Sequence, residues 1–450
     1  MPHNSRRLPT ARLTRRQFLR LSALATASLA AGCAVNPVTG RQQLMLVSED
    51  QEIRIDKENS PHQFSVDYGA IQDSRLNAYI SQVGGKLAAR SHRPQMPYSF
   101  RGVNAVYVNA YAFPGGSIAA TRGILLALEN EAELAALLGH ELGHVNARHT
   151  AAQMSTGMLG NAFLAGATAY IGQRKPLVGD LTEKLGMLGA GLLLASYSRD
   201  NEREADALGM EYMVRAGYNP QGMIGLMAIL QSLSRHQPNV IELMFSTHPM
   251  SDERYRDAEE RARTTYRSAS GLPLSKERYL DETARLRAMK DAIKALQDGE
   301  EAMGKKEYET ARTLFQKALK QTPADYAGLV MMAKCQLAME NYPEASRYAE
   351  LARQAYPQEA QSYHLQGIAK ILQKQYDAAY QSFAASERLL PGNPNTAFFK
   401  GLSLEGMQRR SEAAQEYRRY LGNISQGDQA RHAYGRLIDW GYIRPPQSQR

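Results

Sequence analysis

Two histidines four residues apart, with a glutamate between them, are the side chains whose spacing points most directly to chemistry. His140, Glu141 and His144 lie in a periodic apolar stretch without proline, so we expect them on one helix. Positions i and i+4 share a helix face, so the two imidazoles would converge on one point. Such a pair suits a zinc ion, and Glu141 is then placed to take a proton from a water at that ion. The alternative interpretation is a helix that carries two histidines by chance.

A zinc hydrolase needs a third ligand, because its ion keeps three protein ligands and one open position. Residues 198–209 supply Glu202 and Asp206, which are again i and i+4 on one face of a predicted helix. We assign Glu202 as the ligand and expect Asp206 to accept a hydrogen bond from the second ring nitrogen of a ligand histidine. Glu204 points about 200° away from Glu202 and is expected to be surface charge. The alternative is that these acids only compensate the dipole of their helix.

Together these motifs resemble the zinc metallopeptidases grouped with HtpX, the CAAX prenyl-protease and BepA, which form peptidase family M48. The resemblance also covers Thr247-His248-Pro249, the lead-in 36–41 and the stretch 109–116, and it runs from about residue 36 to about residue 260. It implies that one zinc ion per chain is held by His140, His144 and Glu202. It implies Glu141 as the general base.

The resemblance also places Asp206 behind the site and His248 beside it. A tetrahedral oxyanion needs a donor besides the metal, and His248 is our candidate for that role. Alternatively, His248 could occupy the fourth zinc position and hold the enzyme latent, or be only a loop histidine before a proline. Arg254 follows at a spacing that the family shares and is expected to anchor the same loop by an ion pair. His149 and His236 have no supporting motif, so we expect them to be structural or exposed.

A short strand is expected over residues 115–121, entered through a Pro-Gly-Gly turn directly before the active-site helix. As an edge strand it would pair with a peptide backbone by β-augmentation, through Ser117, Ile118, Ala119 and Ala120. This mode of binding reads main chain more than side chains. It therefore predicts a protease of loose sequence preference that acts on unfolded segments.

The first 32 residues have the composition of a targeting signal, with six Arg and no acidic residue. Residues 14–20 resemble a twin-arginine export signal, and the apolar run that follows is too short to span a bilayer. The end of this segment resembles a bacterial lipoprotein cleavage site, which predicts a lipid on Cys33 and a tether over residues 33–48. Since Ala34 is not Asp, we expect transfer to the outer membrane. The alternative is cleavage after a small residue, which gives a soluble periplasmic protein.

Charge and cysteine content exclude other classes of protein. Removing the six signal arginines from the 54 basic residues leaves 48 against 45 acidic ones, so the mature chain carries a net charge of +3. No basic run with interleaved aromatic residues is present, and we therefore expect no nucleic-acid binding. Two cysteines are too few for a disulfide framework.

The last third of the sequence repeats with a period of 34 residues. Small residues, tyrosines and prolines recur at that spacing: Gly299, Ala333, Gly367 and Gly401; Tyr308, Tyr342 and Tyr376; Pro323, Pro357 and Pro391. These are the small, aromatic and proline positions of tetratricopeptide repeats. We predict four units, and the fourth is degenerate because Arg410 stands where tyrosine is expected; the units are 292–325, 326–359, 360–393 and 394–427. Such stacked helix pairs bind extended peptides or partner proteins, and the alternative is a solenoid that only shields the protease domain.

The sequence thus predicts a mainly α chain of the α+β type. A zincin-like metallopeptidase domain with a small sheet is followed by an α-solenoid of tetratricopeptide repeats; the segments are 49–270 for the metallopeptidase domain, 271–291 for a helical linker, 292–427 for the repeats and 428–450 for a capping helix with a polar tail. The predicted function is a zinc endopeptidase of the bacterial cell envelope that hydrolyses unfolded or misassembled envelope proteins, with outer-membrane proteins included by analogy. The repeats would recruit substrate or dock on outer-membrane assembly machinery. The alternative is a periplasmic chaperone or adaptor whose zinc site is latent.

Overall fold

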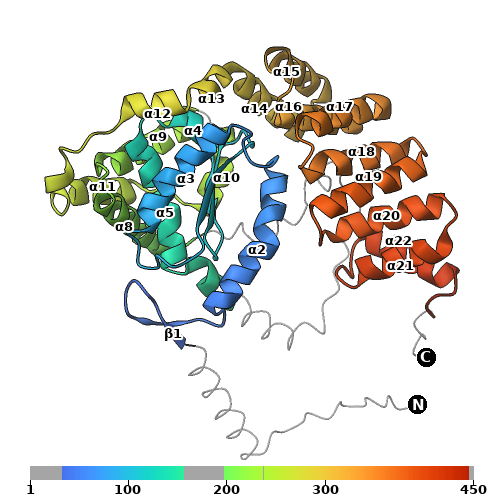
Figure 1. Ribbon diagram of the computed structural model, residues 1–450, viewed down its shortest axis with the longest axis horizontal. Helices are drawn as coiled ribbons and strands as arrows, with labels where there is room; N and C mark the ends of the chain where they lie inside the picture. Colours follow the sequence, from blue (N-terminus) through green and yellow to red (C-terminus); the bar gives the residue numbers. More distant parts are fainter. Residues whose placement is uncertain (1–32, 157–196, 237, 445–450) are drawn as a thin grey trace, which may run out of the picture.

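The computed structural model describes residues 33–156, 197–236 and 238–444, so the predicted signal segment 1–32 lies outside the described residues. Helices dominate, and they form an N-terminal part around a small sheet and a row of paired helices (Figure 1). The predicted fold class is therefore confirmed. The helices of the N-terminal part are α2 (Glu49–Val66), α3 (Ser74–Ala88), α4 (Arg122–Ala127), α5 (Glu131–Asn146), α8 (Arg199–Arg215), α9 (Gln221–His236), α10 (Pro238–Thr247), α11 (Asp252–Arg263), α12 (Lys276–Glu282) and α13 (Ala284–Ala288). No helix in the described part of the chain is long and apolar enough to span a membrane.

The sheet of the N-terminal part has three strands in the order β3 (Ser99–Val103), β5 (Ser117–Thr121), β4 (Ala110–Ala112). The central strand, β5, pairs in parallel with β3 and antiparallel with β4. The prediction that Ser117, Ile118, Ala119 and Ala120 form an edge strand is therefore wrong. Their backbone groups face a neighbouring strand on both sides, and the side chains from Ile118 to Ala120 are fully buried. The edge strands of this sheet are β3 and β4.

The segment expected as a tether, 33–48, begins with an antiparallel hairpin of β1 (Cys33–Val35) and β2 (Gln42–Leu44). After the hairpin the chain docks on the end of the active-site segment, where Met45 and Val47 are buried against Ala151. Arg148 donates a hydrogen bond of 2.7 Å to the carbonyl of Val47. The predicted tether is thus attached to the N-terminal part rather than free, and the lipid on Cys33 stays a prediction.

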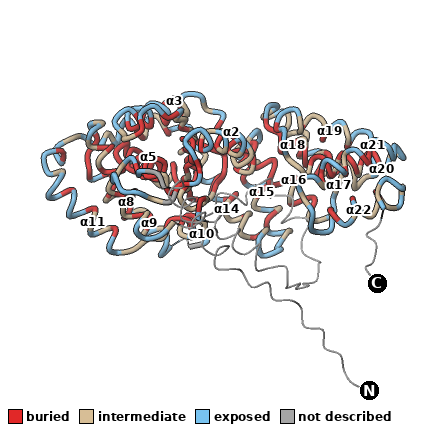
Figure 2. The backbone as a smooth tube through the Cα atoms, turned by 90° about the horizontal axis from the view of Figure 1, so that it is seen from below, coloured by how far each residue is buried: buried red, intermediate tan, exposed pale blue. Residues whose placement is uncertain are grey.

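The helix α5 lies in the middle of the N-terminal part, and all of its residues are buried (Figure 2). Helix α8 packs so closely against α5 that their backbones are in contact. A Cβ atom on Gly143 would lie 2.8 Å from the carbonyl oxygen of Ala205, and one on Gly139 would lie 3.0 Å from that of Gly209. Only glycine leaves room for this approach, which brings side chains of α8 up to the histidines of α5.

The paired helices follow the predicted period of 34 residues. They are α14 (Lys290–Gly304), α15 (Tyr308–Gln321), α16 (Tyr326–Ala338), α17 (Tyr342–Ala355), α18 (Ala360–Leu372), α19 (Tyr376–Leu389), α20 (Pro394–Gly406), α21 (Arg410–Leu421) and the final α22 (Asp428–Asp439). Within three of the pairs a small residue of the first helix faces an aromatic ring of the second, as Gly299 faces Phe315. A left-handed residue at the same place in every unit turns the chain between the two helices: Lys306, Glu340, Lys374 and Gln408, with φ from 60° to 62°.

Buried polar contacts fasten the repeats to the N-terminal part. The guanidinium of Arg122, at the start of α4, forms a bidentate ion pair with Asp325 (2.7 and 3.3 Å), and both side chains are almost fully buried. Asp325 also caps α16 by accepting from the backbone of Gly328. Along the same seam, Glu359 accepts hydrogen bonds from Ser65 of α2 and from Tyr326. Helix α2 accordingly runs between the sheet and the repeats (Figure 1).

Candidate metal centre

Helices α5 and α8 bring the predicted ligands together. The Nε2 atoms of His140 and His144 lie 3.1 Å apart, and the carboxylate of Glu202 lies 3.5 Å from the first and 3.3 Å from the second. Asn130 caps the start of α5, and a capping box of Ser198 and Asn201 fixes the start of α8, the end of that helix that carries Glu202.

Two residues hold this arrangement from behind. Asp206 lies 2.9 Å from Nδ1 of His140, so the hydrogen bond assigns the ring proton to Nδ1 and leaves the Nε2 lone pair facing the centre. Arg254 donates to both oxygens of Asp206 (2.6 and 2.7 Å) and lies 2.6 Å from Glu202. It also donates to the carbonyl of Pro249 (3.0 Å) and so ties the loop after α10 to the site.

His248 lies among the ligand atoms. Its Nδ1 is 3.1 Å from Glu202 and 3.4 Å from Nε2 of His140, and its Nε2 is 3.8 Å from Glu141. One ligand atom each of His140, His144, Glu202 and His248 lie within 4.8 Å of one another. His248 is thus close enough to the three predicted ligands to hold a metal ion together with them.

Burial and neighbouring charges together shift the pKa values of the centre. Burial raises the pKa of the Glu141 carboxyl, and its Oε1 has no hydrogen-bond partner within the described residues. Burial lowers the pKa of His144 and keeps its ring neutral. Burial also opposes the charged form of Glu202, but the neighbouring His248 and His140 outweigh it and lower the pKa of that carboxyl. Three inward imidazole nitrogens, a carboxylate and an unpartnered buried oxygen fit a divalent metal ion.

Comparison with known proteins agrees with this site. Residues 74–262 match the model of peptidase family M48, and residues 302–368 match a tetratricopeptide repeat model. Residues 74–262 thus form a domain of peptidase family M48. The predicted family, with repeats following the peptidase domain, is thus confirmed.

Relatives of this chain include several proteins named beta-barrel assembly-enhancing protease. The one from Yersinia pestis is 31% identical over 259 residues, which cover 54% of this chain and 52% of that protein. The one from Escherichia coli K12 is 31% identical over 202 residues, which cover 43% and 40%. The mitochondrial metalloendopeptidase OMA1 of Schizosaccharomyces pombe is 30% identical over 230 residues, which cover 50% and 65%. The chain therefore spans about half the length of the first of these relatives and less of the second.

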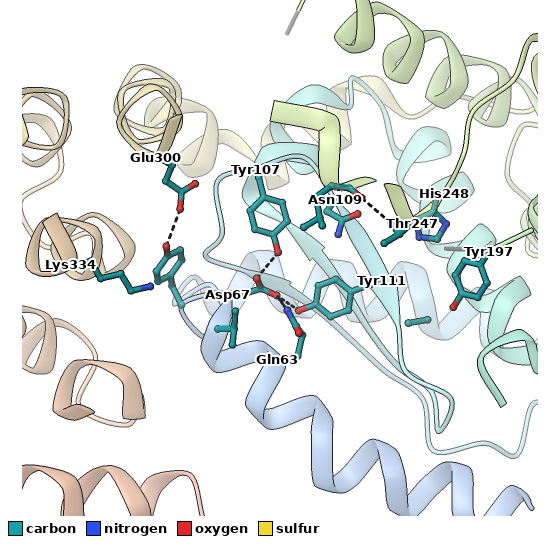
Figure 3. A pocket seen from close by; sticks show the side chains of 14 residues that line it. Gln63, Asp67, Tyr107, Asn109, Tyr111, Tyr197, Thr247, His248, Glu300 and Lys334 are labelled. Carbon is teal, nitrogen blue, oxygen red and sulfur yellow. Dashed lines mark hydrogen bonds between the residues drawn. The ribbon is translucent and has the colours of Figure 1, made fainter. Parts of the chain in front are cut away.

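A cavity of about 270 Å³ opens beside the metal centre of the M48 domain. His248 and Tyr197 lie at one end of it and Glu300 and Lys334 of the repeats at the other (Figure 3). Between them, Asp67 accepts hydrogen bonds from Tyr107 and Tyr111. The lining residues are Gln63, Val66, Asp67, Tyr68, Tyr107, Asn109, Tyr111, Ala112, Tyr197, Leu243, Thr247, His248, Glu300 and Lys334. Both parts of the chain thus contribute to one cavity.

Sequence reasoning missed several residues of the M48 site. His149, expected to be structural or exposed, is buried, and its Nδ1 lies 2.9 Å from Nδ1 of His144. Arg148, with φ of 59°, turns the chain so that His149 returns beneath His144. Glu204, expected at the surface, is only 28% exposed and lies 3.2 Å from Nε2 of His149. Tyr197 stacks on the His144 ring, with centroids 3.9 Å apart.

Proposed function

We propose that the chain is a zinc-dependent metalloendopeptidase of the bacterial cell envelope. The observation that carries this proposal is the convergence of His140, His144 and Glu202 on one point, with the carboxylate of Glu141 beside it. Membership in peptidase family M48 supports it. A nitrogen-rich set with one carboxylate suits zinc better than magnesium or calcium, which prefer oxygen ligands.

When bound, zinc would lower the pKa of a water toward ~7 and polarise the carbonyl of the peptide bond. The residues of the chain then move protons. Glu141 takes the proton of the attacking water and passes it to the leaving amine. Its raised pKa favours holding that proton between the two transfers. Asp206 and Arg254 orient the ligands, and neither touches the reacting atoms.

The substrate lies along β4, the edge strand that borders the cavity. The backbone N–H of Thr121 donates to the carbonyl of Asn109, and the N–H of Phe113 donates to the carbonyl of Ser117. Because hydrogen-bonded and non-bonded positions alternate in an antiparallel pair, the backbone groups of Ala110 and Ala112 point away from β5. An extended peptide can pair with these groups, which moves the predicted β-augmentation from β5 to β4. Loose sequence preference and unfolded substrates remain the expectation.

The repeats take part in substrate binding, because Glu300 and Lys334 line the same cavity as His248. Several relatives are named for beta-barrel assembly, which supports misassembled envelope and outer-membrane proteins as substrates. The repeats could also dock on outer-membrane assembly machinery. The motif ending at Cys33 supports a lipid anchor that holds the chain at the outer membrane from the periplasmic side.

His248 restrains the enzyme by occupying the fourth ligand position, where a substrate carbonyl or water would otherwise bind. The same observation favours a second candidate, a chaperone or adaptor whose zinc site stays latent. Arg254 holds the loop that carries His248 by a hydrogen bond to the carbonyl of Pro249. His248 can therefore leave the fourth ligand position only if this loop moves.

The deciding experiment compares purified wild type, His248→Ala and His248→Ala/Glu141→Gln on an unfolded protein substrate, with zinc content measured for each. We expect one zinc per chain in all three, cleavage by His248→Ala above wild type, and none by the double variant. His236→Ala, which alters an exposed histidine, serves as the matched control. Zinc in every protein without cleavage by His248→Ala would favour the adaptor function, and absence of zinc from wild type would refute the proposed centre.

A further inference from the structure

The two histidines of the metal centre have different partners behind them. Nδ1 of His140 faces a carboxylate, that of Asp206, at 2.9 Å. Nδ1 of His144 faces another imidazole nitrogen, Nδ1 of His149, also at 2.9 Å. A carboxylate can only accept, but an imidazole nitrogen donates or accepts according to its tautomer. The partner of His144 therefore has to be in the correct tautomer itself.

The hydrogen-bond chain behind His144 has one arrangement compatible with metal binding. To offer Nε2 to an ion, neutral His144 must carry its proton on Nδ1 and donate it to His149. His149 must then accept with Nδ1 and carry its own proton on Nε2. That nitrogen lies 3.2 Å from a carboxylate oxygen of Glu204, which can only accept.

We propose that His149 is a positioning residue that, together with Glu204, holds His144 in the tautomer that binds the metal. This inference rests on the proposed function, because it presupposes an ion at His140, His144 and Glu202. Glu204 acts through His149 and His149 acts through His144, so neither touches the ion or the substrate.

Burial and packing support this role. His149 is 4% exposed and lies edge-on to His144, with ring centroids 5.1 Å apart, so its ring is held in place. Tyr197 stacks on the face of the His144 ring, and its hydroxyl bonds to the hydroxyl of Thr150 (2.8 Å), so it does not compete for Nδ1. Helix α8 thus contributes to both histidines: Asp206 behind one of them, and Glu204 behind the partner of the other.

The test measures zinc affinity by competition with a chelator, using the full chain. His149→Phe keeps a planar ring of similar size but removes both nitrogens, and we expect the zinc Kd to rise about 10–100-fold. Glu204→Ala should raise it by a few-fold, since His149 can then still adopt the correct tautomer part of the time. His236→Phe is the matched control and should leave the Kd unchanged.

A double-mutant cycle separates this role from general packing. Because Glu204 acts only through His149, the double variant should bind zinc as weakly as His149→Phe alone. His149→Gln, whose amide can both accept and donate, should recover part of the affinity. Unfolding curves of the metal-free proteins show which variants fold. If His149→Phe does not fold, the zinc Kd of Glu204→Ala decides whether the inference holds.

Wild-type zinc affinity in folded His149→Phe, or in Glu204→Ala, would overturn the inference, as would additive losses in the double variant. Absence of zinc binding by the wild type would instead refute the proposed metal centre, so the two failures are distinguishable.

Discussion

Replacing Gly143 by alanine adds one carbon atom at the point where α5 touches α8. The new Cβ would lie 2.8 Å from the carbonyl oxygen and 2.9 Å from the Cα of Ala205, where ordinary contact begins at 3.4 Å. The helices must therefore separate by roughly 0.5 Å. Glu202 lies on α8 and the two histidines on α5, so this separation stretches the ligand set, although no ligand is altered.

Stability and metal affinity should respond differently to this substitution. Overpacking costs about 1–3 kcal/mol, and the higher helix propensity of alanine offsets about 1 kcal/mol of that. The fold should therefore survive with a net loss of about 0–2 kcal/mol. Metal–ligand distances tolerate only about 0.2 Å, so we expect the zinc Kd to rise at least about tenfold.

The assay combines chelator competition for zinc with guanidinium unfolding of the metal-free protein. Gly85→Ala in α3 is the matched control, because its added Cβ meets no atom within 4 Å. That variant should gain up to about 1 kcal/mol and bind zinc as the wild type does. If Gly143→Ala binds zinc with the wild-type Kd, the argument that this glycine sets the ligand geometry is refuted.

Three further predictions address the metal, the seam and the repeats. Removing the metal with EDTA should lower the melting temperature, and one equivalent of zinc should restore it, since a ligand that binds only the folded state stabilises it; an unchanged melting curve would contradict a bound metal. Asp325→Ala should cost about 3–5 kcal/mol in guanidinium unfolding because it leaves Arg122 buried without its partner, whereas Glu344→Ala, in an exposed pair, should cost under about 1 kcal/mol; equal losses would contradict a structural seam. Burial lowers the pKa of His364 to about 4, below its unfolded value of 6.5, so the unfolded chain binds the proton first and stability should fall as the pH drops from about 6.5 to about 4. At pH 5 the free energy of unfolding should be about 2 kcal/mol lower than at pH 7. His364→Leu, measured by unfolding at both pH values, should lack this loss. An equal pH dependence in both proteins would refute the prediction.

The sequence was most informative where spacing along one element determines geometry. The 34-residue period predicted the paired helices because each unit buries its small residues against its own neighbours, as Gly299 does against Phe315. The i, i+4 pairs likewise predicted which faces of α5 and α8 carry the ligands, since helix geometry fixes side-chain direction within a turn.

The sequence was least informative where distant segments decide the outcome. It predicted a strand over residues 115–121, where β5 spans Ser117–Thr121, but not the neighbours of that strand. Strand β4 has only three residues, Ala110–Ala112, too few for a periodic signal. The return of His149 beneath His144 depends on one backbone angle, at Arg148, which no side-chain pattern encodes. The prediction that Glu204 is surface charge was wrong, because helix geometry gives the direction of a side chain but not which residues pack against it.

The buried pair of Arg122 and Asp325 has a consequence for dissecting this protein. One member stands at the start of α4, beside the sheet, and the other caps α16, so separating the two halves leaves a charge stranded in each. Lys334 and Glu300 would leave with the repeats and take a wall of the cavity with them. A fragment that ends before residue 290 would therefore lack part of the cavity wall. Replacing the repeats by those of another protein would change the side chains that line the cavity beside the metal centre.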